Sequence, residues 1–139
     1  MITKNRILMV DDNEPFRRAL RDSSAQEPDF EIVGEACRLD EALRCIGKLS
    51  PHLVLTDLSM PDARGVEAVT EIRRVYPEVK ILVVSSHRER EYKRPCREAG
   101  ANGFVAKDSV HDALRGAIRA ILNCGTHPGA DDWNAAAAV

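Results

Sequence analysis

Short apolar runs alternate with longer amphipathic stretches along most of this chain. The apolar runs are bounded by polar or turn residues, which is typical of strands buried on both faces of a sheet. The stretches between them repeat apolar residues every three or four positions, which predicts helices packed on that sheet. Strands alternating with helices indicate an α/β fold, a doubly wound five-stranded parallel sheet with helices on both faces. The strands are expected at residues 6–10, 31–36, 53–57, 80–84 and 103–106.

The helical patterns differ in regularity. The last one, residues 110–122, keeps the 3.6-residue period throughout. The first is predicted to be capped by Asp12 or Asn13, a second is expected at 39–49, and Gly65 is expected to open a third. The inner face of the first helix is expected to carry Phe16, Ala19 and Leu20.

The fourth helical region is irregular. Residues 86–94 are densely charged, and Pro95 inside a helix would cost about 3 kcal/mol by removing a donor and clashing with the preceding turn. The pattern therefore predicts either a very short helix starting near Pro95 or a helix kinked there. A mobile, charged segment is expected before it.

The end of the chain changes character. Glycines and a proline interrupt the helical pattern after Asn123. We therefore predict one domain at residues 1–124, and a tail or the start of a linker at 125–139. Trp133 in that tail either packs back on the body or stays disordered, and the pattern leaves both open.

The composition is that of an ordinary globular protein, with 44% hydrophobic and 30% charged residues. The formal net charge of −2 argues against a generally nucleic-acid-binding surface. No apolar run approaches the ~20 residues of a membrane span. The four cysteines lack metal-site spacing and are expected to be reduced, so a cytoplasmic location is predicted.

Charged and hydroxyl side chains follow the strands at one predicted edge of the sheet. Asp11 and Asp12 follow the first strand, Asp57 ends the third, Ser85 follows the fourth and Lys107 the fifth. Three carboxylates brought together repel one another unless a cation joins them, and Mg²⁺ prefers oxygen ligands. A carboxylate can attack phosphorus to form an aspartyl phosphate, while an ammonium group stabilises the transferring charge.

In these residues the chain resembles the receiver domain of response regulators, the phosphoacceptor half of two-component signalling, from about residue 6 to 122. The shared motifs are the Asp pair after the first strand, Asp57-x-x-Met60-Pro61-x-x-x-Gly65, and Lys107 after Gly-Phe-Val-Ala. The resemblance implies a flavodoxin-like strand order 2-1-3-4-5. Residues 84–87 and 100–103 are similar to the NarL/FixJ subgroup, whose output is a LuxR-type helix-turn-helix domain.

The resemblance also implies a phosphoacceptor and a metal site. Asp57 would be the phosphorylated residue. Asp12 would bind Mg²⁺ directly and Asp11 mostly through water, together with Asp57 and the backbone carbonyl of Ser59.

Two further roles come from the same resemblance. Ser85 and Lys107 would contact the phosphoryl group. Ser85 and Phe104 would be the switch pair, in which the hydroxyl moves toward the phosphate and the ring then swings inward.

The expected function is therefore a signalling phosphoacceptor that receives phosphate from a sensor histidine kinase and catalyses only its own phosphotransfer and dephosphorylation. DNA would be reached only through an output domain absent from this chain, and no membrane partner is expected. The alternatives are a stand-alone receiver, or a degenerate receiver acting only through protein contacts. A homodimer face is expected on the last helix together with the last strand, where Arg115 and Arg119 of the helix either take part or remain idle solvated charges.

Two other functional classes fit less well. An aspartyl phosphohydrolase would resemble an Asp-x-Asp arrangement, but Ser59 stands two residues after Asp57. A flavin-binding module of similar fold would need a phosphate-cradling loop after the first strand, where Asp11 and Asp12 would repel a phosphate.

Overall fold

The computed structural model describes residues 4–86, 91–107 and 111–125. Within them the chain alternates between strands and helices, as its hydrophobic pattern predicts. The elements are β1 Asn5–Val10, α1 Glu14–Ser24, β2 Phe30–Ala36, α2 Leu39–Leu49, β3 Leu53–Thr56, β4 Ser59–Met60, β5 Ala63–Arg64, α3 Glu67–Val75, β6 Lys80–Ser85, α4 Lys93–Ala99, β7 Gly103–Ala106 and α5 His111–Cys124.

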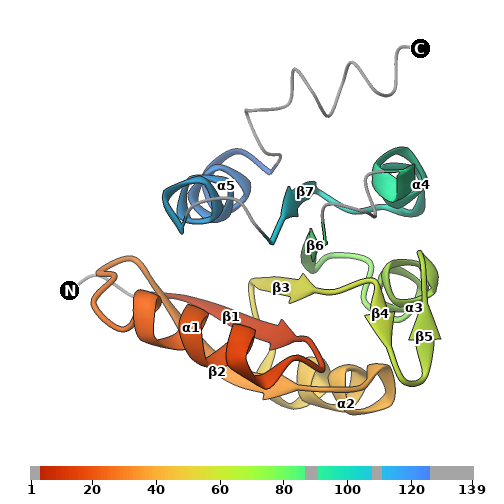
Figure 1. Ribbon diagram of the computed structural model, residues 1–139, viewed down its shortest axis with the longest axis horizontal. Coiled ribbons are helices and arrows are strands. Elements are labelled where there is room, and N and C mark those ends of the chain that lie inside the picture. Colours follow the sequence, from red (N-terminus) through yellow and green to blue (C-terminus); the bar gives the residue numbers. More distant parts are fainter. Residues whose placement is uncertain (1–3, 87–90, 108–110, 126–139) are drawn as a thin grey trace.

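The five long strands form one parallel sheet in the order β2-β1-β3-β6-β7 (Figure 1). Once the short β4–β5 ribbon is set aside, this is the predicted order 2-1-3-4-5. The flavodoxin-like α/β fold is thus confirmed. The more polar second strand lies at the sheet edge, where its exposed and half-buried residues are tolerated.

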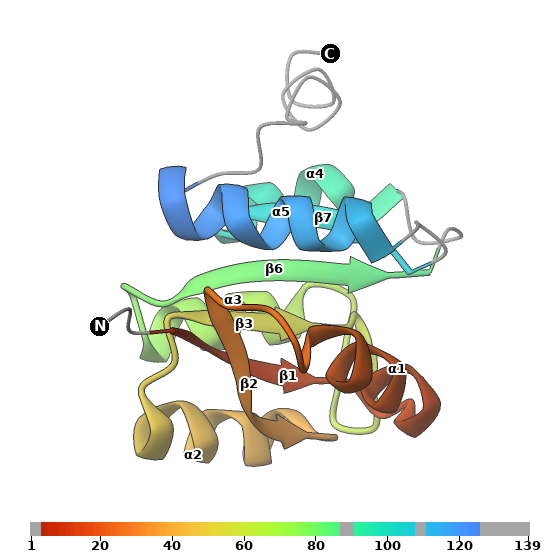
Figure 2. The same cartoon turned by 90° about the vertical axis from the view of Figure 1, so that its left-hand side faces the viewer.

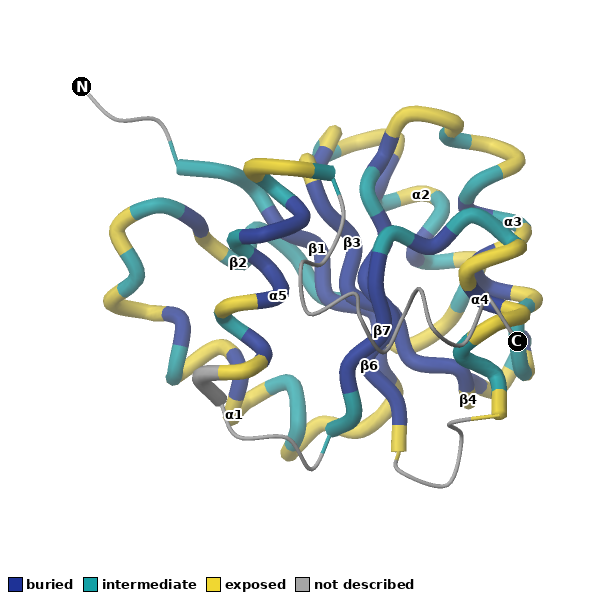
Figure 3. Tube along the Cα trace, turned by 90° about the horizontal axis from the view of Figure 1, so that it is seen from above, coloured by how far each residue is buried: buried dark blue, intermediate teal, exposed yellow. Residues whose placement is uncertain are grey.

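The strands divide their side chains between two hydrophobic clusters, one on each face of the sheet. Leu8 and Val10 of β1 pack on the face covered by α2, α3 and α4. Ile7 and Met9 pack on the opposite face, under α1 and α5 (Figures 1 and 2). This alternation follows from the two-residue period of a strand. Helices cover both clusters, so the central strands β1, β3 and β6 are buried along most of their length (dark blue in Figure 3).

Helix α1 begins as predicted but presents a narrower inner face than expected. The side chain of Asn13 caps it by accepting a hydrogen bond from the Phe16 amide at 3.0 Å. Leu20 is buried and Phe16 half-buried, whereas Ala19 is exposed, so its predicted inward position is wrong. The buried stripe instead runs through positions 16, 20 and 24, four residues apart, and Ala19 lies about 100° around the helix from it.

Gly65 does not open the third helix. It follows the antiparallel β4–β5 ribbon, which the hydrophobic pattern did not predict, and α3 starts two residues later at Glu67. Gly65 has a φ of +59°, and its amide donates to the carbonyl of Leu58 at 2.9 Å. A left-handed glycine thus turns the chain before the helix begins.

Helix α4 is short, which confirms one of the two predicted alternatives at Pro95. It has seven residues, and Pro95 is the third of them, in the first turn, where a backbone N–H has no partner inside the helix. Gly100, with a φ of +111°, ends it. Residues 87–90 lie outside the described residues, and the mobility expected for residues 86–94 stays a prediction.

Two arginines of α5 form ion pairs within the chain. Arg119 donates to Asp29 at 2.8 Å and also pairs with Glu27, while its guanidinium lies 5.4 Å from the Phe30 ring centroid. Arg115 pairs with Glu27 at 3.3 Å. These contacts join α5 to the connection between α1 and β2, and the homodimer face expected on this helix stays a prediction.

Within the described ranges no helix is long and apolar enough to cross a membrane. Helix α5 ends at Cys124, as the glycine and proline pattern predicts. Residues 126–139, including Trp133, lie outside the described residues, so the boundary between domain and tail stays a prediction.

Candidate functional site

The carboxyl ends of the central strands bring the predicted side chains to one rim. The parallel hydrogen-bond ladder continues beyond the strand ends, where Asp57 donates its amide to the carbonyl of Val10 at 3.0 Å. On the neighbouring pair of strands the amide of Lys107 donates to the carbonyl of Ser85 at 2.7 Å. Backbone pairing therefore fixes where each functional residue leaves the sheet.

Lys107 pairs with two carboxylates at this rim. Its Nζ lies 2.8 Å from Oδ2 of Asp11 and 3.4 Å from Oδ2 of Asp57. It also lies 4.9 Å from the ring centroid of Phe16 on α1. Burial lowers the pKa of Lys107, but the hydrogen bond and charge of Asp11, with the charge of Asp57, outweigh it and raise that pKa above its ordinary value. The ammonium group therefore stays charged.

The three predicted carboxylates form a compact cluster. One oxygen from each of Asp11, Asp12 and Asp57 lies within 4.8 Å of the others. Asp11 and Asp57 are buried, with 2% and 5% exposure, whereas Asp12 is exposed. Against one ammonium group, three carboxylates leave two negative charges unbalanced at the rim. An oxygen-rich cluster of this size and charge fits a hard divalent cation such as Mg²⁺.

Backbone amides fix the two buried carboxylates. Oδ1 of Asp57 accepts a hydrogen bond from the amide of Leu58 at 2.8 Å, and Oδ1 of Asp11 accepts one from Asn13 at 2.8 Å. Each carboxylate is thus oriented through one oxygen and turns the other toward Lys107.

A cavity of about 330 Å³ opens beside this cluster and is lined in part by residues that the sequence did not single out. The predicted members are Asp12, Asp57 and Lys107, with Ser59 from β4. Asn13 and Ser86 also line it. Asn13 had been interpreted only as a helix cap, and Ser86 only as part of the subgroup motif at residues 84–87 and of the charged segment at 86–94. Their positions next to Asp12 and Ser85 were the available signal.

The two residues expected to form a switch are both buried. Ser85 ends β6 with no exposed surface, and Ser86 rather than Ser85 lines the cavity. Phe104 is 8% exposed and belongs to the cluster under α2, α3 and α4. The ring of Phe104 therefore lies inward in this structure.

Comparison with known proteins identifies the family. The model of the response regulator receiver domain matches residues 7–119. The transcriptional regulatory protein DegU of Brevibacillus brevis is 33% identical over 124 residues, which are 89% of this chain and 52% of that protein. The uncharacterised transcriptional regulatory protein YhcZ of Bacillus subtilis is 38% identical over 109 residues, 78% of this chain and 51% of that protein. The chain thus spans about half the length of the curated relatives it matches.

Solved structures agree with this assignment. A two-component response regulator of the LuxR family from Aurantimonas sp. SI85-9A1 superposes with a TM-score of 0.84 at 32% identity, covering 96% of both chains. The receiver domain of the putative response regulator NarL from Mycobacterium tuberculosis superposes with a TM-score of 0.75 at 28% identity, covering 87% of this chain and 95% of that one. This chain belongs to the response regulator receiver domain family, and its relatives are regulators of the LuxR and NarL type.

Proposed function

We propose that this receiver domain accepts a phosphoryl group on Asp57 from a sensor histidine kinase. The observation that carries the proposal is the rim itself: a buried, oriented carboxylate faces Lys107 and stands within 4.8 Å of two other carboxylates. Asp57 also lines the cavity, through which a phosphoryl donor can reach it. An isolated strand-end aspartate serving as a turn residue would need none of these neighbours.

In the proposed reaction, the carboxylate of Asp57 attacks phosphorus. A bond forms between the carboxylate oxygen and phosphorus while the phosphorus–nitrogen bond of the donor phosphohistidine breaks, and the imidazole leaves. The amide of Leu58 holds Asp57 in orientation. Lys107 would pair with the phosphoryl oxygens, and its contacts with Phe16 and Asp11, which hold the ammonium group at the rim, support this role.

The carboxylates of Asp11, Asp12 and Asp57, with the backbone carbonyl of Ser59, would hold Mg²⁺. When bound, this ion neutralises charge on the transferring group. Without a cation, the cluster would repel an incoming phosphoryl group, because two negative charges remain unbalanced. The clustered candidate ligands are carboxylate oxygens of Asp11, Asp12 and Asp57, which supports magnesium over a softer metal.

The proposed response is a change at Ser85 and Phe104. The hydroxyl of Ser85 would move toward the phosphoryl group, and Phe104 would occupy the space behind it. The ring of Phe104 already lies inward in this structure, which is the end position of the proposed response. The output would be transcription control through a LuxR-type DNA-binding domain outside these 139 residues, a proposal supported by the relatives named as transcriptional regulators. A homodimer formed during this response is part of the same proposal.

Intact mass measured after incubation with Mg²⁺ and acetyl phosphate tests the proposal. We expect one added phosphoryl group in the wild type. The adduct should be absent in Asp57→Asn and when EDTA removes the metal. It should also be discharged by hydroxylamine, which cleaves acyl phosphates.

The matched control is Asp22→Asn, which removes an exposed carboxylate on α1 away from the rim. It should form the adduct at the wild-type rate. An adduct that survives Asp57→Asn would move the acceptor elsewhere. No adduct with any donor, including a phosphorylated histidine kinase, would reduce the protein to a receiver that acts only through protein contacts.

A further inference from the structure

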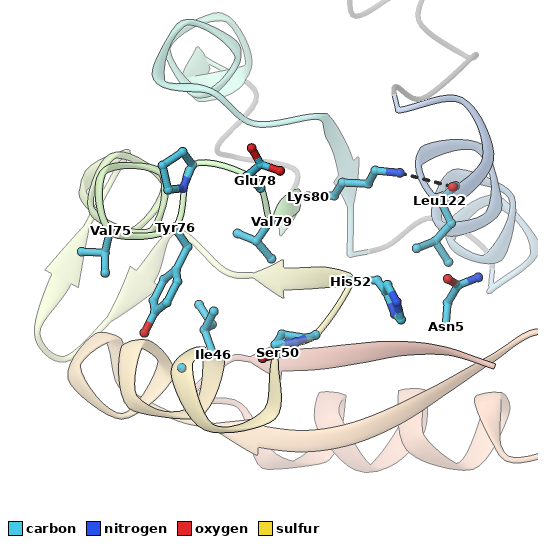
Figure 4. A pocket seen from close by; sticks show the side chains of 13 residues that line it. Asn5, Ile46, Ser50, His52, Val75, Tyr76, Glu78, Val79, Lys80 and Leu122 are labelled. Atoms are coloured by element: carbon cyan, nitrogen blue, oxygen red, sulfur yellow. Dashed lines mark hydrogen bonds between the residues drawn. The ribbon is translucent and has the colours of Figure 1, made fainter. Parts of the chain in front are cut away.

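A second and larger pocket lies at the opposite edge of the sheet, where the strands begin. It has a volume of about 470 Å³, which is within the range of ligand sites. Its walls are largely apolar and include Ile46, Val75, Tyr76, Val79 and Leu122 (Figure 4). Val75 is 39% exposed, and among the described residues it is the one large hydrophobic side chain that lies exposed. Covering an apolar pocket of this size with another apolar group removes apolar surface from water, which is favourable.

The chain leaves the described body beside this pocket. Leu122 near the end of α5 forms one wall, and its carbonyl accepts a hydrogen bond from Lys80 at 3.2 Å. Three residues later, the carbonyl of Gly125 accepts a hydrogen bond from the side chain of Asn102 at 2.9 Å. The end of α5 is thus fixed at the same edge of the sheet as the pocket. Whatever follows Gly125 starts next to the hollow.

The segment that follows carries the chain's one tryptophan, Trp133. Eight residue steps separate Gly125 from Trp133, a reach of up to about 28 Å in extended backbone. We propose that the pocket at the start of the strands holds the indole of Trp133, so that residues 126–139 fold back on the domain. A buried indole contributes a large apolar area, and its N–H needs one acceptor, for which the carboxylate of Glu78 at the pocket wall is suited.

The charges around the pocket suit this occupant. Asp131 and Asp132 directly precede Trp133. Lys80 lines the pocket, and Arg6 lies beside it, with its guanidinium 2.7 Å from the carbonyl of Ser50. Among the ion pairs found between described residues, neither cation has a carboxylate partner. Two aspartates arriving with the indole would meet these two cations, while the single Glu78 opposes them.

The tether makes even a weak contact sufficient. Because only eight residue steps join Trp133 to the body, the effective concentration of its indole at the pocket is in the millimolar range. A contact with a dissociation constant near 1 mM, about −4 kcal/mol, is then populated substantially. The reverse also holds, since a weak contact of this kind can be broken by one charged substitution.

Fluorescence of Trp133 in the full chain tests the proposal without a label. We expect emission shifted to shorter wavelength than in a peptide of residues 126–139. Collisional quenching by acrylamide should be about threefold weaker than in that peptide, as for an indole docked about two-thirds of the time. Val75→Glu should return both values to those of the peptide, because a carboxylate would then stand in the apolar wall and repel Asp131 and Asp132.

The matched control is Thr70→Glu, an exposed position on the same helix that does not line the pocket. It should keep the wild-type spectrum, and circular dichroism of both variants should show an intact fold. Peptide-like quenching in the wild type would overturn the proposal. Protection that survives Val75→Glu would place the indole elsewhere, and protection lost on dilution would assign the pocket to a second copy of the chain; either result also overturns it.

Discussion

Lys107 is the residue on which the charge balance of the rim depends. It pairs with two carboxylates that are almost wholly buried, and its own side chain is 21% exposed. Removing one partner of a buried charge pair is costly because the other charge stays behind without compensation. Here two charges would stay behind. The same cluster would hold a divalent cation, so the lysine and the metal compensate the same carboxylates.

We therefore predict that Lys107→Ala destabilises the fold by about 1–3 kcal/mol in EDTA, the usual cost of leaving a buried polar group without its partner. Added Mg²⁺ should narrow this gap, because the carboxylates that Lys107 no longer compensates bind the cation more tightly, and each tenfold gain in affinity over the wild type contributes about 1.4 kcal/mol at saturating Mg²⁺. Urea unfolding with and without Mg²⁺ measures both quantities. Lys48→Ala, at an exposed position of α2, is the control and should change little. Equal destabilisation in EDTA and in Mg²⁺ would separate the lysine from the metal site.

At the scale of elements, helix α2 is capped by a residue of the β4–β5 turn. Its own N-cap residue, Arg38, makes no capping hydrogen bond through its side chain. Instead the carboxylate of Asp62 accepts hydrogen bonds from the amides of Leu39 at 2.7 Å and Asp40 at 3.0 Å. Burial works to raise the pKa of Asp62, but these hydrogen bonds outweigh it and hold that pKa below its ordinary value. The loop after the phosphoacceptor strand is thereby attached to α2.

Asp62→Ala should lower the free energy of unfolding by about 1 kcal/mol at neutral pH, the usual contribution of a capping side chain. Because the folded-state pKa lies below the unfolded value of 3.8, this contribution is present above pH 3.8 and is lost as the pH falls through the folded pKa. Unfolding curves of the two proteins should therefore converge in acid. Asp22→Ala serves as the control, and a gap that persists at low pH would exclude the carboxylate cap.

The β4–β5 ribbon and the Asp62 cap are two features that the sequence pattern did not predict. The long strands and α5 were predicted because a buried face imposes a period on the sequence. The two-residue strands of the ribbon are too short to show a period, and Asp62 caps a helix that begins 23 positions earlier in the chain. Gly65 was interpreted as a helix start because its left-handed conformation cannot be seen in the pattern.

At the scale of the whole molecule, Arg119 joins the last helix, α5, to the connection between α1 and β2. It pairs with Asp29 and Glu27 across about ninety positions of sequence. The predicted carboxylates and Lys107 meet at the rim because strand order alone brings them there. Contacts such as those of Arg119, Phe16 and Ser86 depend on side-chain direction after packing, which hydrophobic periodicity and strand order do not specify.

Arg119→Gln should cost about 1 kcal/mol at low ionic strength, since the pair network is partly exposed. The difference from the wild type should shrink in about 1 M NaCl, where the screening length falls to about 3 Å. Urea unfolding at two salt concentrations measures it, with Arg18→Gln on α1 as an exposed control whose pair stays within one helix. A salt-independent loss would show that packing on Phe30, not charge, provides the stability.

Strand β3 has one consequence for how a signal can cross the molecule. It pairs in register with β1 on one side and β6 on the other, residue for residue from Leu53 to Thr56. A slip of one position would turn every side chain of the strand to the wrong face. His52 at one end and Asp57 at the other are therefore held at a constant separation, five rises of about 3.3 Å. The sheet is therefore the rigid part of the molecule, and a conformational change that starts at the phosphoacceptor must involve the helices and loops packed on the sheet.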